Sequence, residues 1–244
     1  MSKILVISDI HANLIALEAV LADAGEVSEV WCLGDIVGYG PWPNECIERI
    51  ANLPNLTAMM GNHDYALLDG IALHAFNPEA RTALLWQKEQ LSLASWEFLK
   101  SQSIQPVVRQ GMTLVHGSPR DPIWEYVMNT MIARLNLEFF GTPWCVVGHS
   151  HFQAIFQYHT EEDSFSIEIP PLDAPYLLQD RAILNPGSVG QPRDRDPRAA
   201  YALYHPQQKT WEARRVAYDI ARVQAQIRAV GLPERHAARL SAGW

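Results

Sequence analysis

The first 60 residues alternate short apolar runs with segments of helical period, and this alternation limits the possible folds more than any other feature of the chain. Apolar runs that suit strands occupy residues 3–7, 30–33 and 56–60. Between them, residues 13–24 and 44–53 carry apolar side chains at helical spacing. This order of strands and helices is typical of a layered α/β domain.

The rest of the chain adds more strands than one sheet comfortably holds. We expect one or two helices in residues 77–101, strands at residues 107–108, 112–115, 145–147, 152–158, 165–169, 182–184, 200–204 and 211–216, and helices near residues 129–140 and 220–230. So many strands favour two stacked sheets with helices outside them. Because no internal repeat or clear linker occurs, we predict one domain over residues 1–244, with a helical cap inserted at about residues 65–105.

Composition narrows the class of protein. The chain has 244 residues, 48% of them hydrophobic, and the apolar run 4–7 is too short to cross a membrane. Its formal net charge is −8 and it has no basic block, so we expect no non-specific nucleic-acid binding. The three cysteines lack CxxC spacing, and two lie in apolar runs, which suits core positions in a reducing compartment: Cys32, Cys46 and Cys145. We therefore expect a cytoplasmic protein without a membrane span, and the oligomeric state stays open.

Five of the predicted strands end in side chains that can bind a metal ion. The side chains at these ends are Asp9 with His11, Asp35, Asn62 with His63, His116, and His149 with His151. Ligands of open α/β sheets bind outside the carboxyl ends of the strands, so we expect these groups to converge. Glycines precede the polar residue at three ends, at Gly34, Gly61 and Gly148, where they serve either as ordinary turn residues or to let the backbone approach a bound group closely.

The converging side chains make up a ligand set of oxygen and nitrogen atoms. With His63 left aside, the set contains two carboxylates, one amide and four imidazoles, and no thiolate. This composition suits two divalent or trivalent transition-metal ions, from Mn, Fe, Zn, Co or Ni, and argues against an iron–sulfur cluster. Seven ligands suffice for two ions if one carboxylate bridges them, and a metal pair can clamp the attacking and leaving oxygens of a phosphoryl displacement. An acidic protein would thereby present a positive centre to a phosphate.

The same residues form sequence blocks in a fixed order. The blocks read Asp9-Ile10-His11, Gly34-Asp35, Gly61-Asn62-His63-Asp64, His116-Gly117 and Gly148-His149-Ser150-His151. They resemble the signature of the calcineurin-like metallophosphoesterases: D-x-H, G-D, G-N-H-D/E, a lone H, and G-H-x-H. Residues 185–193 are similar to the corresponding segment of the small prokaryotic phosphodiesterase branch, so the resemblance covers most of the chain.

The resemblance implies a four-layer αββα sandwich with a dinuclear metal centre. By matching positions, the first metal would be held by Asp9, His11, Asp35 and His151, and the second by Asp35, Asn62, His116 and His149. Asp35 would bridge the two ions. His63 would stand free to donate a proton to the leaving oxygen.

The segment after Asp35 departs from the protein phosphatase branch of this family. In that branch the G-D block continues with a second aspartate that orients the catalytic histidine, whereas here it continues with Ile36 and Val37 and then Gly38. A protein Ser/Thr phosphatase role is therefore disfavoured. Asp64 is the nearest candidate in sequence to orient His63.

Two arginines are candidates for substrate binding, because a guanidinium matches a phosphate bidentately. Arg193 opens a segment of alternating charge, which suits either phosphate binding or a solvated loop. Arg120 follows His116 closely, together with Trp124 and Tyr126, whose rings would either stack on a base or pack in the core.

These observations predict a metal-dependent hydrolase of phosphoric esters. The substrate would be a small phosphodiester or a nucleotide, attacked in line by a hydroxide that the metal ions activate, with His63 as general acid. One alternative is a phosphomonoesterase. Another is a non-catalytic scaffold that retains the fold, which is disfavoured because every ligand position and His63 are retained.

Overall fold

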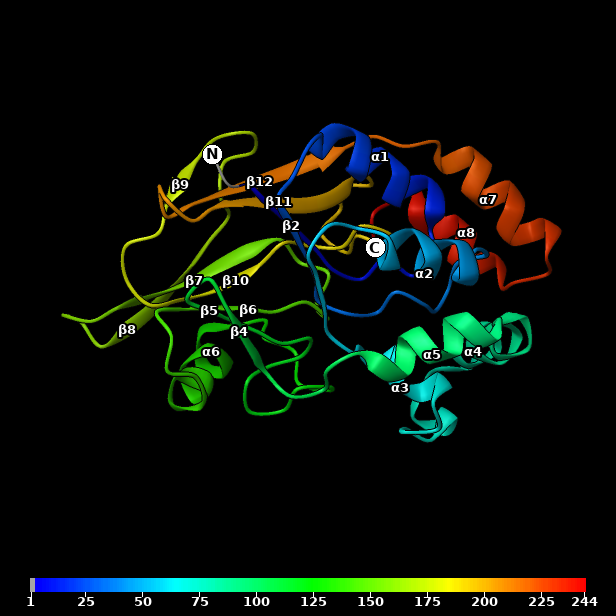
Figure 1. The fold of residues 1–244 in the computed structure, drawn as a ribbon, viewed down its shortest axis with the longest axis horizontal. Helices are drawn as coiled ribbons and strands as arrows, with labels where there is room; N and C mark the ends of the chain where they lie inside the picture. The colour runs from blue at the N-terminus through cyan, green and yellow to red at the C-terminus, as the bar shows by residue number, and fades with distance from the viewer. Residues whose placement is uncertain (1–2) are drawn as a thin grey trace.

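The computed structural model describes residues 3–244, and its strands form two six-stranded sheets (Figure 1). The first sheet has the order β3 (Leu56–Ala58), β2 (Glu29–Cys32), β1 (Ile4–Ile7), β11 (Ala199–His205), β12 (Thr210–Val216) and β9 (Tyr176–Leu177). The second has the order β4 (Val107–Arg109), β5 (Met112–Leu114), β6 (Trp144–Val146), β10 (Ala182–Asn185), β7 (Ala154–His159) and β8 (Ser164–Glu168). Each sheet contains three neighbouring parallel strands, β1 to β3 in the first and β5, β6 and β10 in the second.

Five of the eight α-helices in residues 3–244 begin after a residue whose side chain caps them. They are α1 (Leu14–Ala24), α2 (Pro43–Ala51), α3 (Asn62–Leu67), α4 (Pro78–Gln90), α5 (Leu93–Ser101), α6 (Thr130–Asn136), α7 (Ile220–Ala229) and α8 (Glu234–Leu240), with short 3₁₀ turns η1 (Leu73–Ala75) and η2 (Leu137–Phe139). Asn13, Asn77 and Asp219 each accept a hydrogen bond from a backbone N–H in the first turn of the helix that follows. Ser92 caps α5 in the same way, so residues 77–101 form two helices rather than one.

The buried apolar residues in the described part of the chain form four clusters, and three of them follow from the alternation along the strands. On β1, Leu5 and Ile7 belong to the cluster that includes Leu17 of α1. Ile4 and Val6 face the other way, into the cluster that lies between the two sheets. A third cluster joins the far side of the second sheet to α6. The four-layer αββα prediction is therefore confirmed.

The helices from α3 to α5 pack on the same core as α1 and α2. Leu67, Phe76, Leu84 and Leu99 are buried members of the cluster that contains Leu17. In Figure 1 these helices lie together, beside α2. They thus form part of the outer helical layer, and their role as a cap over a site stays a prediction.

Two α-helices and one strand lie outside the sequence predictions, and β3 is among several strands that are shorter than predicted. The unpredicted elements are α3, α8 and the two-residue strand β9. Strand β3 ends at Ala58 rather than at residue 60, because Met59 pairs only through an isolated bridge to Ser103. The chain turns there into α3, which begins directly at Asn62.

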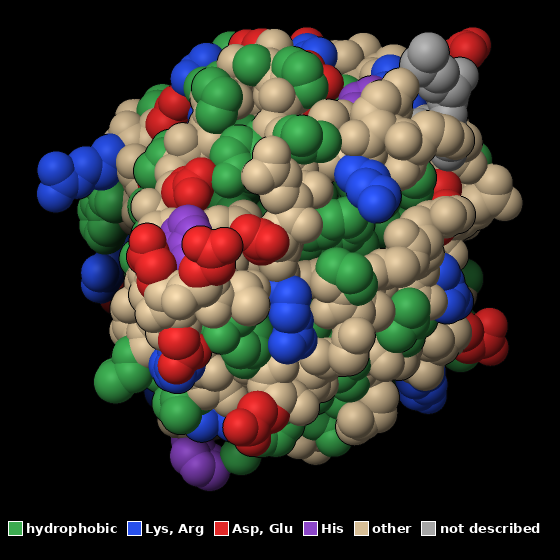
Figure 2. Space-filling model, turned by 90° about the vertical axis from the view of Figure 1, so that its left-hand side faces the viewer, with side chains coloured by type: hydrophobic (Ala, Val, Ile, Leu, Met, Phe, Trp, Pro, Cys, Tyr) green, Lys and Arg blue, Asp and Glu red, His purple; other side chains and the backbone are tan. Residues whose placement is uncertain are grey.

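The surface and the cysteines agree with the compositional analysis. Cys32, Cys46 and Cys145 are buried and unpaired, as small core residues are expected to be. On the face drawn in Figure 2, basic side chains are scattered among acidic ones rather than gathered into a stripe. Within residues 3–244, no helix is long and apolar enough to cross a membrane.

Candidate metal centre

The carboxyl ends of β1, β2, β3, β5 and β6 meet at one buried site. Its polar side chains are the seven predicted ligands and the predicted acid, all of them almost fully buried: Asp9, His11, Asp35, Asn62, His63, His116, His149 and His151. Both sheets contribute, because β1, β2 and β3 belong to the first and β5 and β6 to the second. The structure therefore brings together every residue of the predicted set.

Five of these residues have a backbone conformation that side chains other than glycine rarely adopt. The φ angles are 54° at Asp9, 49° at His11, 53° at Asp35, 63° at His149 and 59° at His151. Left-handed φ values at non-glycine residues are uncommon and store strain, and they cluster at functional sites. Contacts with the surrounding structure hold these five residues in strained turns, and their side chains point into the same buried site.

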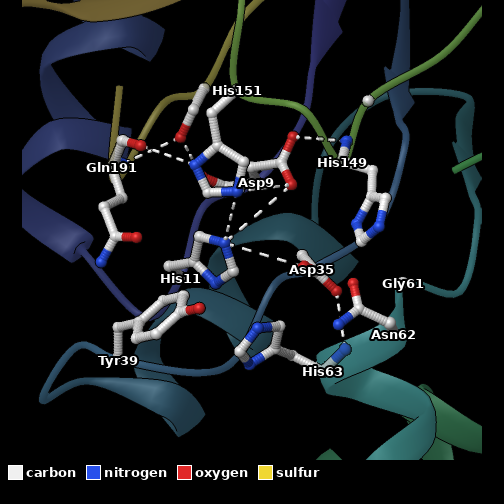
Figure 3. A network of polar contacts seen from close by, with 12 residues as sticks. Asp9, His11, Asp35, Tyr39, Gly61, Asn62, His63, His149, His151 and Gln191 are labelled. Atoms are coloured by element: carbon white, nitrogen blue, oxygen red, sulfur yellow. Dashed lines mark hydrogen bonds and ion pairs between the residues drawn. The ribbon is translucent and has the colours of Figure 1, made fainter. Parts of the chain in front are cut away.

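Asp9, His11 and His151 form the first group of potential ligands (Figure 3). Asp9 Oδ1 lies 3.3 Å from His151 Nε2 and 3.9 Å from His11 Nε2. The two imidazole Nε2 atoms are 3.2 Å apart. One ligand atom from each of the three residues therefore faces a common point.

Asp35, His116 and His149 form the second group. Asp35 Oδ1 lies 3.6 Å from His116 Nε2, and Asn62 Oδ1 lies 3.1 Å from the same nitrogen. The other oxygen of Asp35, Oδ2, lies 3.7 Å from His11 Nε2 in the first group. Asp35 thus presents one oxygen to each group, a position from which a carboxylate can bridge two ions.

Each predicted histidine ligand donates a hydrogen bond from one ring nitrogen to a backbone carbonyl oxygen. The Nδ1 atoms of His11, His116 and His151 lie 2.9, 2.8 and 2.6 Å from the carbonyl oxygens of Val37, Leu33 and Gln191. His149 is reversed, with Nε2 at 3.2 Å from the carbonyl oxygen of Trp124. Since a carbonyl only accepts, the bonded nitrogen carries the proton and the other nitrogen offers a lone pair. Metal-binding histidines are oriented in this way by outer partners.

The first group would be repulsive without a cation. Because Nδ1 carries the proton in His11 and His151, their Nε2 atoms and Asp9 Oδ1 all present lone pairs to one another. Asp9 Oδ1 is buried and accepts no hydrogen bond from any residue that the structure describes. A buried acceptor without a donor is costly. A metal ion held by these atoms removes that cost, so the residues fit the group.

Burial sets the charge state of the site. It is the largest cause that lowers the pKa of each imidazole below its ordinary value, so the rings are neutral at neutral pH and can act as ligands: His11, His63, His116, His149 and His151. Burial, followed by the charges of Asp64 and Asp9, raises the pKa of Asp35. Cations between the carboxylates would oppose this repulsion, and ligand protons would leave on metal binding.

His63 lies beside the two groups rather than in the middle of either. Its ring centroid is 4.9 Å from that of His11, and its Nδ1 is buried without a hydrogen-bond partner among residues 3–244. One ring nitrogen also lies within 4.8 Å of ligand atoms of His11 and Asp35. The geometry thus allows His63 to be a proton donor or a further ligand.

Asp64 does not orient His63 in this structure. Its carboxylate oxygens accept hydrogen bonds from the backbone N–H groups of Val37, at 3.1 Å, and Gly61, at 3.0 Å. Burial raises the pKa of this carboxyl to about 6. Asp64 therefore ties together the backbone loops that carry Asp35 and His63.

Two glycines make room for these side chains. A Cβ atom at Gly61 would lie 2.0 Å from Asp35 Oδ1, so the close approach predicted for this glycine is to a ligand residue. Gly38 has a φ of +93°, and a Cβ atom there would lie 2.4 Å from His63 Nδ1. His63 thus packs against Gly38. Gly38 follows Val37, in the segment where the sequence departs from the protein phosphatase pattern.

The two candidate arginines differ in position. Arg120 forms an ion pair with Glu125, and its role as a substrate contact stays a prediction. The backbone N–H of Arg193 donates to the carbonyl of His151 at 3.4 Å, and its guanidinium donates to the Tyr39 hydroxyl at 3.4 Å. Arg193 therefore adjoins the centre, whereas Arg120 is engaged elsewhere.

Aromatic rings that the sequence did not assign, or left undecided, complete the site. The Tyr126 ring stacks on His149 with centroids 3.8 Å apart, and the Trp124 ring packs at 5.4 Å from Phe76. The Tyr39 ring lies 4.6 Å from both His11 and His63. No pattern in the sequence marks Tyr39, because the rings that it contacts are far from it along the chain: His11, His63 and His236.

Two stacked mixed sheets with a buried Asp and His centre at their parallel strand ends are the architecture of a metallophosphoesterase. The model of the calcineurin-like phosphoesterase superfamily domain matches residues 2–209. The chain belongs to this superfamily, whose members are metal-dependent and act on phosphate esters.

Known proteins resemble the chain over its whole length. The uncharacterized protein MJ0912 of Methanocaldococcus jannaschii is 37% identical over 249 residues, which cover 99% of this chain and 98% of the relative. A crystal structure of a metallophosphoesterase from Sphaerobacter thermophilus is 46% identical, covers 100% of this chain and 99% of its own, and superposes with a TM-score of 0.91. The hypothetical protein PH1004 of Pyrococcus horikoshii, at 24% identity, covers 100% of this chain and 99% of its own, and shares the fold with a TM-score of 0.79.

Protein purified without chelator and loaded with Mn²⁺ should hold about two metal ions per chain, because Asp35 offers one oxygen to each ligand group. Mass spectrometric metal analysis after removal of free metal gives the stoichiometry. A chelator-treated sample of the same protein sets the baseline. Saturation at one ion per chain would contradict a dinuclear centre.

Proposed function

We propose that this protein hydrolyses a small phosphodiester or a nucleotide at a dinuclear metal centre. Membership of the superfamily supports the general class, a phosphoesterase. The observation that carries the dinuclear proposal is the position of Asp35, whose two oxygens face separate groups of buried ligand atoms. The buried, unpaired cysteines also agree with a cytoplasmic location, which stays a prediction.

The chain would hold one ion with Asp9, His11, Asp35 and His151, and the other with Asp35, Asn62, His116 and His149. When bound, such ions supply Lewis acidity and lower the pKa of water enough to provide a nucleophile at neutral pH. The protein keeps the imidazoles neutral by burial and fixes each ring through a backbone carbonyl. It thereby prepares the ligand atoms before the substrate arrives.

His63 is proposed to give its proton to the leaving oxygen of the ester. Burial, followed by the positive charge of Arg193, lowers the pKa of His63, so the ring is neutral while the site is free of substrate. The negative charge of a bound phosphate ester acts in the opposite direction and favours the protonated ring. The proton would thus be taken up as the substrate binds, and no residue of the described range 3–244 forms a hydrogen bond with Nδ1.

Bis-p-nitrophenyl phosphate should be cleaved faster than p-nitrophenyl phosphate at equal concentration. The reason is the similarity of residues 185–193 to the phosphodiesterase branch and the absence of a second aspartate after Asp35. Initial rates of nitrophenolate release, measured with Mn²⁺, Co²⁺, Ni²⁺ and Zn²⁺ in turn, decide the preference.

A chelator-treated sample gives the rate without metal for both esters. A consistent preference for the monoester under these metals would favour the phosphomonoesterase alternative. Absence of hydrolysis of either ester by metal-loaded protein would favour the non-catalytic scaffold.

A further inference from the structure

A cavity of about 360 Å³ adjoins the metal centre and shares a wall with it. Tyr39, Tyr126 and Arg193 line this cavity. Tyr39 lies against both His11 and His63 (Figure 3), and Tyr126 stacks on His149. The two tyrosines that line the cavity therefore also contact two of the predicted metal ligands, His11 and His149.

Helix α8, which the sequence analysis did not predict, also lines the cavity. This helix contributes Arg235, His236 and Arg239 to the lining. The His236 ring lies 4.9 Å from the Tyr39 ring, and the Arg239 guanidinium carbon lies 5.9 Å from the same ring. Tyr39 thus contacts both α8 side chains and histidines of the metal centre.

The cavity carries more positive than negative charge. Among its described lining residues are three arginines and a single acidic side chain, Glu79, which lies 3.8 Å from Arg235. Burial, followed by the charge of Arg193, lowers the pKa of Arg239 to about 10, which leaves it charged at neutral pH. In a chain of net charge −8, three arginines against one carboxylate in the lining of a cavity indicate an anionic ligand. Arg239 Nε also donates to the carbonyl oxygen of Trp244.

One buried donor in the cavity lining has no hydrogen-bond partner among the described residues. Arg193 Nε is buried and makes no hydrogen bond within residues 3–244. Its terminal nitrogen Nη2 donates to the Tyr39 hydroxyl at 3.4 Å and to Gln191 Oε1 at 3.2 Å. Buried donors are normally paired, so an unpaired one beside two further arginines favours a ligand oxygen at this position.

We propose that this cavity binds a second phosphate group of the substrate, and that the substrate class is a nucleotide-type ester with at least two phosphates. The inference rests on the proposed function, because the metal centre would hold the reacting phosphate. Guanidinium groups match phosphate oxygens in geometry and charge, and three of them line the cavity. Arg235 and Arg239 are then specificity residues that distinguish diphosphates from monophosphates.

The test compares ADP with AMP, which differ only by the second phosphate. Isothermal titration calorimetry on metal-replete protein, without excess free metal, should show ADP binding roughly 10- to 100-fold tighter than AMP. In Arg239→Gln and in Arg235→Gln this ratio should fall toward one. The Arg235 side chain is 61% exposed, so its variant is expected to fold even if Arg239→Gln does not.

Arg228→Gln is the matched control, since Arg228 pairs with Glu234 at the surface and is outside the cavity lining. It should keep the wild-type ratio of affinities. Equal affinity of ADP and AMP for the wild-type protein, or an unchanged ratio in both cavity variants, would overturn the proposal. Because calorimetry requires no turnover, it decides this point even if the protein hydrolyses no phosphate ester and the proposed function fails.

Discussion

An Asp35→Asn variant should lose affinity for both metal ions. The loss should exceed roughly 100-fold, which is the upper range for removing a residue that only hydrogen-bonds to a metal ligand. Asp35 Oδ2 lies 3.7 Å from His11 Nε2 and Oδ1 lies 3.6 Å from His116 Nε2. A neutral amide cannot offset two neighbouring dications, so their repulsion would go uncompensated. His11→Ala should instead weaken mainly the first ion, because His11 belongs to one proposed set.

Metal titration of each variant, followed by mass spectrometry and by turnover of bis-p-nitrophenyl phosphate, measures these losses. Asp69→Asn is a matched control: it makes the same change at an exposed carboxylate that pairs with Lys88 and lies outside the proposed ligand sets. It should retain both ions. An Asp35→Asn protein that binds two ions as tightly as the wild-type protein would contradict the bridging role of Asp35.

Much of the fold was predictable because local pattern and tertiary environment agree. Strands such as β1 and β6 are buried on both faces, and their continuous apolar runs are visible in the sequence. Helix starts were predictable where a cap residue precedes the helix, as at Asn13 and Asn77. Helix α3 was missed because it begins at Asn62, inside the segment that the sequence marks as a site.

The convergence of the metal-binding side chains within each sheet was also predictable, because parallel strands place their carboxyl ends at one edge. That the ends of β5 and β6 meet those of β1 to β3 depends on how the two sheets stack. The left-handed backbone at Asp9 and His149 was not, since strain of this kind depends on contacts between distant loops. The arginines of α8 are separated from the first strand by most of the chain, and no spacing links them to it. Their contribution follows from the packing of α8 beside Tyr39.

His63→Ala should keep both metal ions but lose roughly 10²- to 10⁴-fold in turnover, the range for a positioned general acid. The loss should depend on the leaving group. A p-nitrophenolate leaves readily without a proton, whereas a ribose alkoxide does not. The variant should therefore be impaired far more on a ribose ester, such as a nucleoside 2′,3′-cyclic phosphate, than on bis-p-nitrophenyl phosphate.

The surroundings of His63 suit two roles, a general acid and a metal ligand, and this experiment distinguishes them. Its Nδ1 has no hydrogen-bond partner in the described chain, which suits a nitrogen reserved for substrate, yet a ring nitrogen also lies within 4.8 Å of ligand atoms of His11 and Asp35. Metal content and both turnover rates are measured on the same preparation, with the exposed His74→Ala variant as control. Equal losses on the two esters, or loss of an ion together with activity, would mean that His63 serves as a ligand or a structural residue, because only a proton donor makes the defect follow the basicity of the leaving oxygen.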